Sequence, residues 1–269
     1  MSRQVSIQDI RHAKTEGRKL VMLTAYDYPF GLMSDESEVD IVLVGDSLGM
    51  VVMGHTGTEK VTMEEMIHHI KAVVNGCQGP LVVGDMPFGS YHVSMEQAVG
   101  NAVRLVKEGG CDVVKLEGGV DIAPTVKAIV KAGVPVQGHI GLTPQTATAL
   151  GGFKMQGKNA AAAKQIYDDA MALEKAGVFS IILEAVPAPL GKVIAESVSV
   201  PVIDMVGLFD KFLPKFVKQY AQIREVILEA FAEYKKEVLS GAFPGPEHTF
   251  TMSDQALDDL KTMIASDQG

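Results

Sequence analysis

The chain has 269 residues, of which 47% are hydrophobic and 21% are charged, so it can bury a large core and has little reason to be disordered. Its formal net charge of −9, with no cluster of basic residues, argues against nucleic-acid binding and against binding to an acidic membrane surface. The two cysteines, Cys77 and Cys111, are too few for a disulfide framework and lack the paired spacing of a zinc site, so we interpret both as buried thiols.

The amino-terminal residues are polar and mixed in charge, without the apolar segment and small-residue cleavage site of a secretory signal. No apolar run approaches the roughly 20 residues that cross a bilayer. We therefore expect a cytoplasmic protein that does not bind membranes. The length suits one (β/α)₈ barrel of roughly 250 residues, although two smaller domains would also fit.

Short runs of apolar and β-branched residues alternate with longer helical patterns, which is typical of parallel βαβ units. The runs are almost unbroken, as expected for strands that are buried on both faces. Seven strands are predicted, over residues 20–27, 40–46, 80–85, 112–117, 134–140, 179–184 and 200–204.

Helical patterns lie before, between and after these strands. Capping-box signals at Thr62 and Ser94 begin two helices that end near Gly76 and Gly109. Further helices are predicted over residues 6–17, 120–132, 158–176, 211–220 and 223–240. No linker rich in Pro and Ser interrupts the pattern, so we predict a single barrel domain over residues 1–269, with an amino-terminal helix and carboxyl-terminal helices.

Acidic residues stand at the carboxyl ends of six of the seven predicted strands. They are Asp27, Asp46, Asp85, Glu117, Glu184 and Asp204. In a barrel these ends form the rim that carries the active site. A single acid there is more often a helix cap or a loop hydrogen bonder, but six on one rim would repel one another unless a cation or a proton lies among them. Hard oxygen ligands without a Cys or His cluster favour Mg²⁺ over zinc.

Other polar residues near the same rim are candidates for the chemistry. Lys115 and Glu117 point to the same side of their strand, so Lys115 is either a structural ion-pair partner of Glu117 or a cation for a substrate oxygen. Glu184 follows an apolar run and is a candidate general base. His139 is either a donor to a substrate oxygen or a structural histidine. Glycine precedes both Asp46 and Asp85, which indicates either close approach of a ligand or backbone, or only tight turns.

Several motifs, taken in order, resemble one enzyme family. They are residues 24–27 (Thr-Ala-Tyr-Asp), 44–50 (Val-Gly-Asp-Ser-Leu-Gly-Met), 84–91 (Gly-Asp-Met-Pro-Phe-Gly-Ser-Tyr), 114–119 (Val-Lys-Leu-Glu-Gly-Gly), 138–145 (Gly-His-Ile-Gly-Leu-Thr-Pro-Gln) and 243–248 (Phe-Pro-Gly-Pro-Glu-His). Their order and spacing resemble the ketopantoate hydroxymethyltransferase family.

The resemblance implies a (β/α)₈ TIM-type barrel of the phosphoenolpyruvate/pyruvate superfamily. It implies transfer of a hydroxymethyl group from 5,10-methylenetetrahydrofolate to 3-methyl-2-oxobutanoate, which gives 2-dehydropantoate for pantothenate and coenzyme A biosynthesis. It also implies a homo-oligomer, a decamer, that takes an oxo acid and a folate as its small-molecule partners.

The same resemblance implies roles for individual residues. The Mg²⁺ ligands would be Asp46, Asp85 and Glu117. The oxo acid would be contacted by Asp46, Ser47, Asp85 and Lys115. Glu184 would accept the proton, and the roles of Asp27, His139 and Asp204 stay open.

One segment departs from the family pattern. Members continue from the seventh strand through a Gly-Ile-Gly-Ala-Gly turn into an eighth strand that ends in His-Asp, whereas here Ile203 and Asp204 run directly into Met205. The eighth strand is therefore shortened or missing, and Asp204 is interpreted as the far side of the join. A barrel without this strand has two unpaired edges. Either residues are omitted from the sequence, or the chain is a shortened variant whose folate site and activity are in question.

Two alternative functions remain at this point. One is a Mg²⁺-dependent oxo-acid lyase or mutase of the same superfamily, although the Lys-Lys-Cys-Gly-His type of loop common in those enzymes is missing from the sequence. The other is a catalytically inactive paralogue that acts as an assembly partner, which the missing strand suggests and the retained acids argue against.

Overall fold

The computed structural model describes residues 4–148, 152–204, 221, 223–240 and 242–248. Backbone contacts divide the chain into two compact units, residues 1–215 and 216–269, and each is described by itself. The single-domain organisation of residues 1–269 therefore stays a prediction. The helix predicted over residues 211–220 lies outside the described residues.

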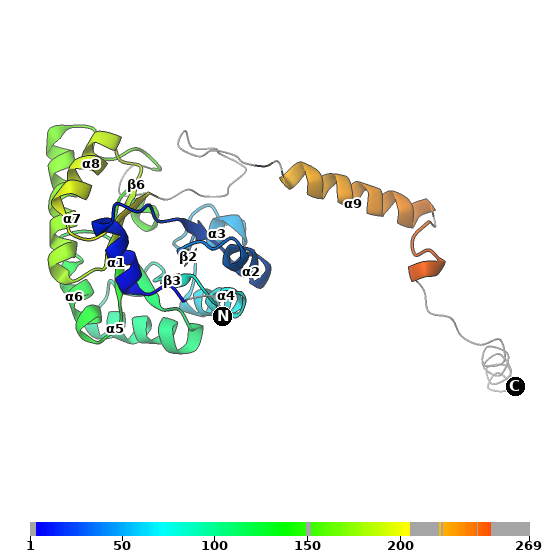
Figure 1. The fold of residues 1–269 in the computed structure, drawn as a ribbon, viewed down its shortest axis with the longest axis horizontal. Coiled ribbons are helices and arrows are strands. Elements are labelled where there is room, and N and C mark those ends of the chain that lie inside the picture. The colour runs from blue at the N-terminus through cyan, green and yellow to red at the C-terminus, as the bar shows by residue number, and fades with distance from the viewer. Residues whose placement is uncertain (1–3, 149–151, 205–220, 222, 241, 249–269) are drawn as a thin grey trace, which may run out of the picture. The chain divides into compact units, whose positions relative to one another are not determined.

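The first unit is built around a parallel sheet whose strands follow one another in chain order (Figure 1). The strands are β1 (Met22–Thr24), β2 (Ile41–Val44), β3 (Leu81–Asp85), β4 (Val113–Glu117), β5 (Val136–Gly141), β6 (Ser180–Glu184) and β7 (Val202–Asp204). All seven predicted strands are confirmed. Within the described residues there is no eighth strand, so β1 and β7 each pair on one side only.

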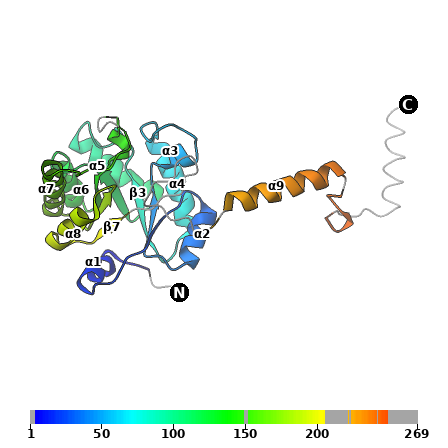
Figure 2. The same ribbon diagram turned by 90° about the horizontal axis from the view of Figure 1, so that it is seen from above.

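Helices connect the strands and pack on the outside of the sheet (Figures 1 and 2). They are α2 (Tyr28–Glu36), α3 (Leu48–Val51), α4 (Met63–Gly76), α5 (Met95–Arg104) with a π-helical turn η1 (Leu105–Gly109), α6 (Ala123–Lys131), the 3₁₀ turn η2 (Pro144–Thr146), α7 (Ala160–Ala176) and α8 (Ala188–Ser197). The capping box at the start of α4 is confirmed, because Thr62 accepts from the Glu65 backbone while Glu65 accepts from Thr62. Helices α2 and α8 were not predicted from the sequence.

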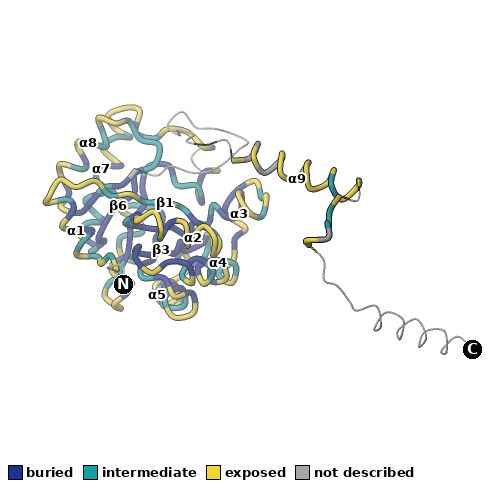
Figure 3. Tube along the Cα trace, turned by 45° about the vertical axis from the view of Figure 1, so that its right-hand side comes forward, coloured by how far each residue is buried: buried dark blue, intermediate teal, exposed yellow. Residues whose placement is uncertain are grey.

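Two apolar clusters form the core of this unit, and Figure 3 shows buried residues in its interior with exposed residues around them. The larger cluster joins the outer face of the sheet to the helices around it. The smaller cluster lies on the inner face of the curved sheet. It consists of Ile10, Ile41, Leu43, Leu81, Val83, Val113, Phe179 and Ile203. Ile10 comes from the amino-terminal helix α1 (Ile7–Thr15), so this helix packs against the end of the sheet where the strands begin.

The described part of the second unit consists of α9 (Ile223–Ser240) and the 3₁₀ turn η3 (Pro246–His248). Helix α9 confirms the prediction over residues 223–240. Among the residues that the structure describes, no helix has both the length and the apolar character needed to cross a membrane.

Candidate active site

Sheet register brings the predicted polar residues together. Asp85 on β3 lies beside Lys115 on β4, and Glu117 at the end of β4 lies beside His139 on β5. Glu184 at the end of β6 lies beside Gly141. Neighbouring strands are only about 4.8 Å apart, so residues that are in register and face inward come into direct contact. The cluster therefore follows from the pairing of successive strands.

The cluster is buried in the polar end of the sheet interior, beyond the smaller apolar cluster. Asp46, Asp85, Lys115 and Glu117 are each at most 5% exposed, and His139 is fully buried. The Glu184 side chain retains 14% of its exposure, so it is the most accessible charged group of the cluster. Buried charges are costly unless they are paired, so the contacts among these side chains decide what the site can do.

Lys115 supplies positive charge at the centre of the cluster. Its Nζ lies 2.8 Å from Asp85 Oδ1 and 3.9 Å from Glu117 Oε1. Burial lowers the pKa of Lys115, but the charges of the surrounding acids outweigh this and raise it above its usual value. Lys115 therefore stays charged, and its shorter ion pair is with Asp85, although the sequence pointed only to Glu117.

His139 connects two acids that stand on different strands. Its Nδ1 lies 3.4 Å from Glu117 Oε1, and its Nε2 lies 3.2 Å from Glu184 Oε2. Burial and the charge of Lys115 lower the pKa of His139, but its contacts with the two glutamates outweigh them and raise it to about 9. The imidazole thus lies between the two carboxylates, although its Nε2 and Glu184 Oε2 are close without forming a hydrogen bond.

The three predicted metal ligands differ in their electrostatics. Burial raises the pKa of Asp46 well above its usual value, and the charge of Asp85 raises it further. Burial also raises the pKa of Asp85, against the effect of Lys115. Burial raises the pKa of Glu117 too, but its contact with His139 and the nearby cations bring it below its usual value. Lys115 alone thus does not offset the cost of ionising Asp46 and Asp85, and a further positive charge beside them would stabilise their ionised forms.

Two further residues of the cluster, Tyr91 and Gln145, were missed as functional residues by the sequence analysis. The Gln145 Nε2 donates to Asp46 Oδ2 at 2.8 Å, and its backbone N–H donates to Glu117 Oε2 at 3.0 Å. The Tyr91 hydroxyl donates to Gln145 Oε1 at 2.6 Å. Tyr91 and Gln145 are the last residues of two motifs that carry the family resemblance, at residues 84–91 and 138–145. Their place in these motifs was the signal in the sequence that pointed to them.

Three predicted residues remain, which are Ser47, Asp27 and Asp204. The Ser47 hydroxyl is 2.9 Å from that of Tyr26, whose pKa burial raises to about 12. Asp27 is exposed and caps helix α2 by accepting from the Phe30 backbone, so it is not part of the cluster. Asp204 ends β7, and its side chain lies outside the described residues.

The two glycines that precede the acids have different neighbours. A Cβ on Gly45 would lie 2.8 Å from Ser47 Oγ and 3.8 Å from Asp85 Oδ2, so Gly45 keeps space open within the cluster. A Cβ on Gly84 would lie 2.7 Å from Ile70 and 3.0 Å from Cys111, so Gly84 admits core packing instead. Close approach is therefore the reason for both glycines, but only Gly45 faces the site.

The donor set suits a hard divalent cation, although the described residues contain no group of three His, Cys, Asp or Glu side chains already arranged to hold a metal ion. Asp85 Oδ1 is buried and accepts no hydrogen bond from the described residues, its contact being the ion pair with Lys115. Carboxylate oxygens are the ligands that Mg²⁺ prefers. Oxygen donors, burial and excess negative charge together fit a divalent cation at Asp46 and Asp85.

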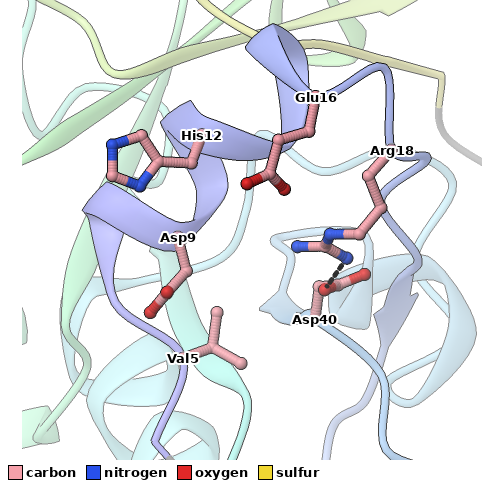
Figure 4. A pocket seen from close by; sticks show the side chains of 6 residues that line it. All are labelled: Val5, Asp9, His12, Glu16, Arg18 and Asp40. Carbon is pink, nitrogen blue, oxygen red and sulfur yellow. Dashed lines mark hydrogen bonds and ion pairs between the residues drawn. The ribbon is translucent and has the colours of Figure 1, made fainter.

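A separate cavity of about 410 Å³ lies beside helix α1 (Figure 4). It is lined by Val5, Asp9, His12, Glu16, Arg18 and Asp40, and the Arg18 guanidinium forms an ion pair with Asp40 at 2.6 Å. Asp40 comes directly before β2, so this cavity lies at the end where the strands begin, opposite to the acid cluster. We therefore do not assign it to the candidate active site.

Comparison with known sequences identifies close relatives over nearly the whole chain. The sequence model of a family described as ketopantoate hydroxymethyltransferase matches residues 4–246. A curated protein of Heliobacterium modesticaldum, named 3-methyl-2-oxobutanoate hydroxymethyltransferase, is 53% identical over 271 residues, covering 95% of this chain and 98% of the relative.

Solved structures with a similar fold have little sequence in common with this chain. A 2,3-dimethylmalate lyase of the PEP mutase/isocitrate lyase superfamily aligns with a TM-score of 0.60 at 13% identity, covering 98% of both chains. A phosphonopyruvate hydrolase, solved with oxalate and Mg²⁺, aligns with a TM-score of 0.57 at 11% identity, covering 96% of both chains. These matches support the barrel fold of this chain.

The alignment with the Heliobacterium protein also reveals a shortfall in this chain. It extends over 271 residues, but 95% of 269 residues is only about 256, so about 15 aligned positions have no residue here. Similar shortfalls, of about 15 to 17 positions, follow from the alignments with other relatives of the same name. A loop and a strand missing after Ile203, as expected from the sequence, would account for a shortfall of this kind.

Proposed function

Because the chain belongs to the ketopantoate hydroxymethyltransferase family, we propose that it transfers a hydroxymethyl group from 5,10-methylenetetrahydrofolate to 3-methyl-2-oxobutanoate. The product is 2-dehydropantoate, and the reaction belongs to pantothenate biosynthesis. The observation that carries the proposal is the buried cluster at the carboxyl ends of the strands, where Lys115 and His139 contact three acids.

Asp46, Asp85 and Glu117 would hold Mg²⁺. When bound, this ion would stabilise the negative charge that develops on the oxygens of the oxo acid. The raised pKa values of Asp46 and Asp85 support this role, because a nearby cation relieves the cost of ionising two buried carboxyls. The phosphonopyruvate hydrolase solved with Mg²⁺ shares the fold, which is consistent with a magnesium site.

Glu184 would act as the general base. Its carboxylate would accept the C3 proton of 3-methyl-2-oxobutanoate, and the electron pair of the broken C–H bond would form the enolate. Water would break both C–N bonds of the folate-borne methylene, which releases formaldehyde and tetrahydrofolate. The C3 carbon would then attack the formaldehyde carbon, and its oxygen would take up a proton to become the hydroxyl of the product. The partial exposure of Glu184 supports this role, since a base must reach its substrate.

Lys115 and Ser47 would orient the oxo acid together with Asp46 and Asp85. Lys115 is charged and has hydrogens to donate toward a carboxylate or enolate oxygen. The Ser47 hydroxyl is half-buried beside Tyr26, so it can donate to a substrate oxygen while accepting from the Tyr26 hydroxyl.

The proposed reaction is tested by measuring 2-dehydropantoate formation from 3-methyl-2-oxobutanoate with and without methylenetetrahydrofolate. We expect product only when the folate is present, and loss of product when EDTA removes the divalent cation. Turnover of oxo acids without folate would indicate a lyase, and oxo-acid binding with no turnover would indicate an inactive paralogue.

We also propose a cytoplasmic homo-oligomer, a decamer, on the basis of the family resemblance. Light scattering coupled to size-exclusion chromatography measures the subunit number directly. A monomeric mass at micromolar concentration would contradict this part of the proposal.

A further inference from the structure

We infer that Gln145, held in place by Tyr91, is a positioning residue that orients the Asp46 carboxylate for a divalent cation. The inference rests on the metal site of the proposed function and extends it to two residues that would not touch the cation themselves. Both belong to loops outside the strands that carry the acids, since Tyr91 follows β3 and Gln145 lies in the turn η2 after β5.

The Gln145 side chain donates two hydrogen bonds. Its Nε2 donates to Asp46 Oδ2 at 2.8 Å and to the Met86 carbonyl at 2.9 Å. Of the described residues, Gln145 alone donates a side-chain hydrogen bond to the Asp46 carboxylate. One oxygen of Asp46 is therefore fixed by the protein, and the other can face a ligand.

The hydrogen-bond partners of Gln145 fix the orientation of its amide. Asp46 Oδ2 and the Met86 carbonyl are both acceptors, so the amide nitrogen must face them. The amide oxygen then faces the Tyr91 hydroxyl, which donates to it at 2.6 Å. The same hydroxyl accepts from the Glu117 backbone N–H at 3.2 Å. A flipped amide would place Gln145 Oε1 against Asp46 Oδ2 and the Met86 carbonyl oxygen, which are both acceptors. The hydrogen bonds therefore allow one orientation of the amide.

Tyr91 and Gln145 are both buried. Tyr91 is 1% exposed and Gln145 is 6% exposed, so water has little access to replace a lost partner. Hydrogen bonds that orient a metal-binding carboxylate typically change metal affinity 10- to 100-fold when they are removed. Because Tyr91 reaches Asp46 through Gln145, removal of the hydroxyl acts through the amide and should have the smaller effect.

Binding of Mn²⁺ to the metal-free protein, followed by electron paramagnetic resonance, tests the inference without using activity. We expect Gln145→Met to weaken Mn²⁺ binding by about 10- to 100-fold and Tyr91→Phe by up to about tenfold. The double variant should bind no more weakly than Gln145→Met alone, because Tyr91 acts through Gln145. Tyr91→Phe keeps the ring that stacks on His92 at 4.0 Å, so it covers the case in which Gln145→Met does not fold.

Thr146→Val is the matched control, because it removes a side-chain hydrogen bond with Thr143 from the same turn without touching an acid. We expect its Mn²⁺ dissociation constant to equal that of the parent. If both test variants bind Mn²⁺ as tightly as the parent and only melt at lower temperature, the residues are structural and the inference is wrong. If Thr146→Val weakens binding equally, the turn and not the amide is responsible, which also overturns it. A parent protein that binds no Mn²⁺ would refute the metal site of the proposed function itself.

Discussion

At the scale of single residues, the surroundings of Glu184 distinguish it from the other acids of the cluster. Its side chain is partly exposed, and one carboxylate oxygen contacts His139. The next residue, Ala185, has a φ of 49°, a conformation that residues with a side chain rarely adopt. A Cβ on Gly141 would lie 2.4 Å from the Glu184 carbonyl oxygen, so glycine is required beside it. Backbone strain and close packing thus fix the position of the proposed base.

Replacement of this base is the first prediction. Glu184→Gln keeps the shape of the side chain but cannot accept a proton at neutral pH, so we expect exchange of the C3 proton of 3-methyl-2-oxobutanoate in D₂O to fall at least about 100-fold. Nuclear magnetic resonance measures this exchange, and Mg²⁺-dependent binding of the oxo acid should persist. The control is Glu196→Gln, an exposed site on α8. Exchange at the parental rate in Glu184→Gln would rule out the base assignment.

The cysteines give a second residue-scale prediction. Burial raises the pKa of Cys77 to about 11 and that of Cys111 to about 12. Because the thiolate is the reactive form, neither thiol should react with Ellman's reagent in the native protein at about pH 8. Both should react in concentrated guanidinium. Rapid release of the coloured product by the native protein would contradict the buried interpretation.

The sequence predicted the residue types of the site better than their contacts. Asp46, Asp85 and Glu117 could be predicted because each ends an apolar run, and parallel strands end at one rim. The contact between His139 and Glu184 depends on the register of β5 and β6, which the pattern of apolar residues does not determine. Gln145 lies in a turn, where no periodicity indicates the direction of a side chain.

At the scale of elements, the strands could be predicted more completely than the helices. Buried strands are continuous apolar runs, and their sequence is therefore distinctive. Helix α2 begins directly after its cap Asp27, which was predicted as one of the strand-end acids. Helix α8 begins after Pro187 with a proline in its first turn but without a side-chain cap, so the usual capping signal of a helix start is missing. Both helices were missed because the signals that begin a helix were either assigned to the strand or missing from the sequence.

Helix α1 gives an element-scale prediction, because Lys14 ties it to the region between α8 and β7. The Lys14 Nζ donates to the backbone oxygens of Ala195, Val198 and Val200 at 2.5 to 2.9 Å. Lys14→Met keeps the aliphatic chain but leaves these oxygens without their donor, so we expect a loss of about 2 kcal/mol in the free energy of unfolding. Urea titration followed by circular dichroism measures this loss. Lys19→Met, at an exposed position, is the control, and equal unfolding midpoints for the two variants would contradict the prediction.

At the scale of the whole molecule, the part of the chain that the structure describes forms seven strands of the barrel. The described sheet has seven strands, and the chain has about 15 residues fewer than its Heliobacterium relative over the aligned region. Val21, directly before β1, and Leu23 on β1 are 52% and 41% exposed. Unpaired strand edges and exposed apolar side chains both cost stability and favour association. The acids that form the proposed site lie at or just after the ends of β2, β3, β4 and β6, so none of them belongs to β1 or β7, the two edge strands of the described sheet.

Restoration of the missing segment is the last prediction. Insertion after Ile203 of the residues that only the Heliobacterium protein has should supply a strand between β7 and β1. Pairing both edges and covering Val21 and Leu23 should raise stability by at least about 2 kcal/mol, which corresponds to about 4–8 °C in the melting temperature of a domain of this size. A Gly/Ser segment of equal length is the control, because it lengthens the chain without favouring a strand. Differential scanning calorimetry compares the two, and equal melting temperatures would mean that the edges of β1 and β7 are already satisfied in the chain as it stands.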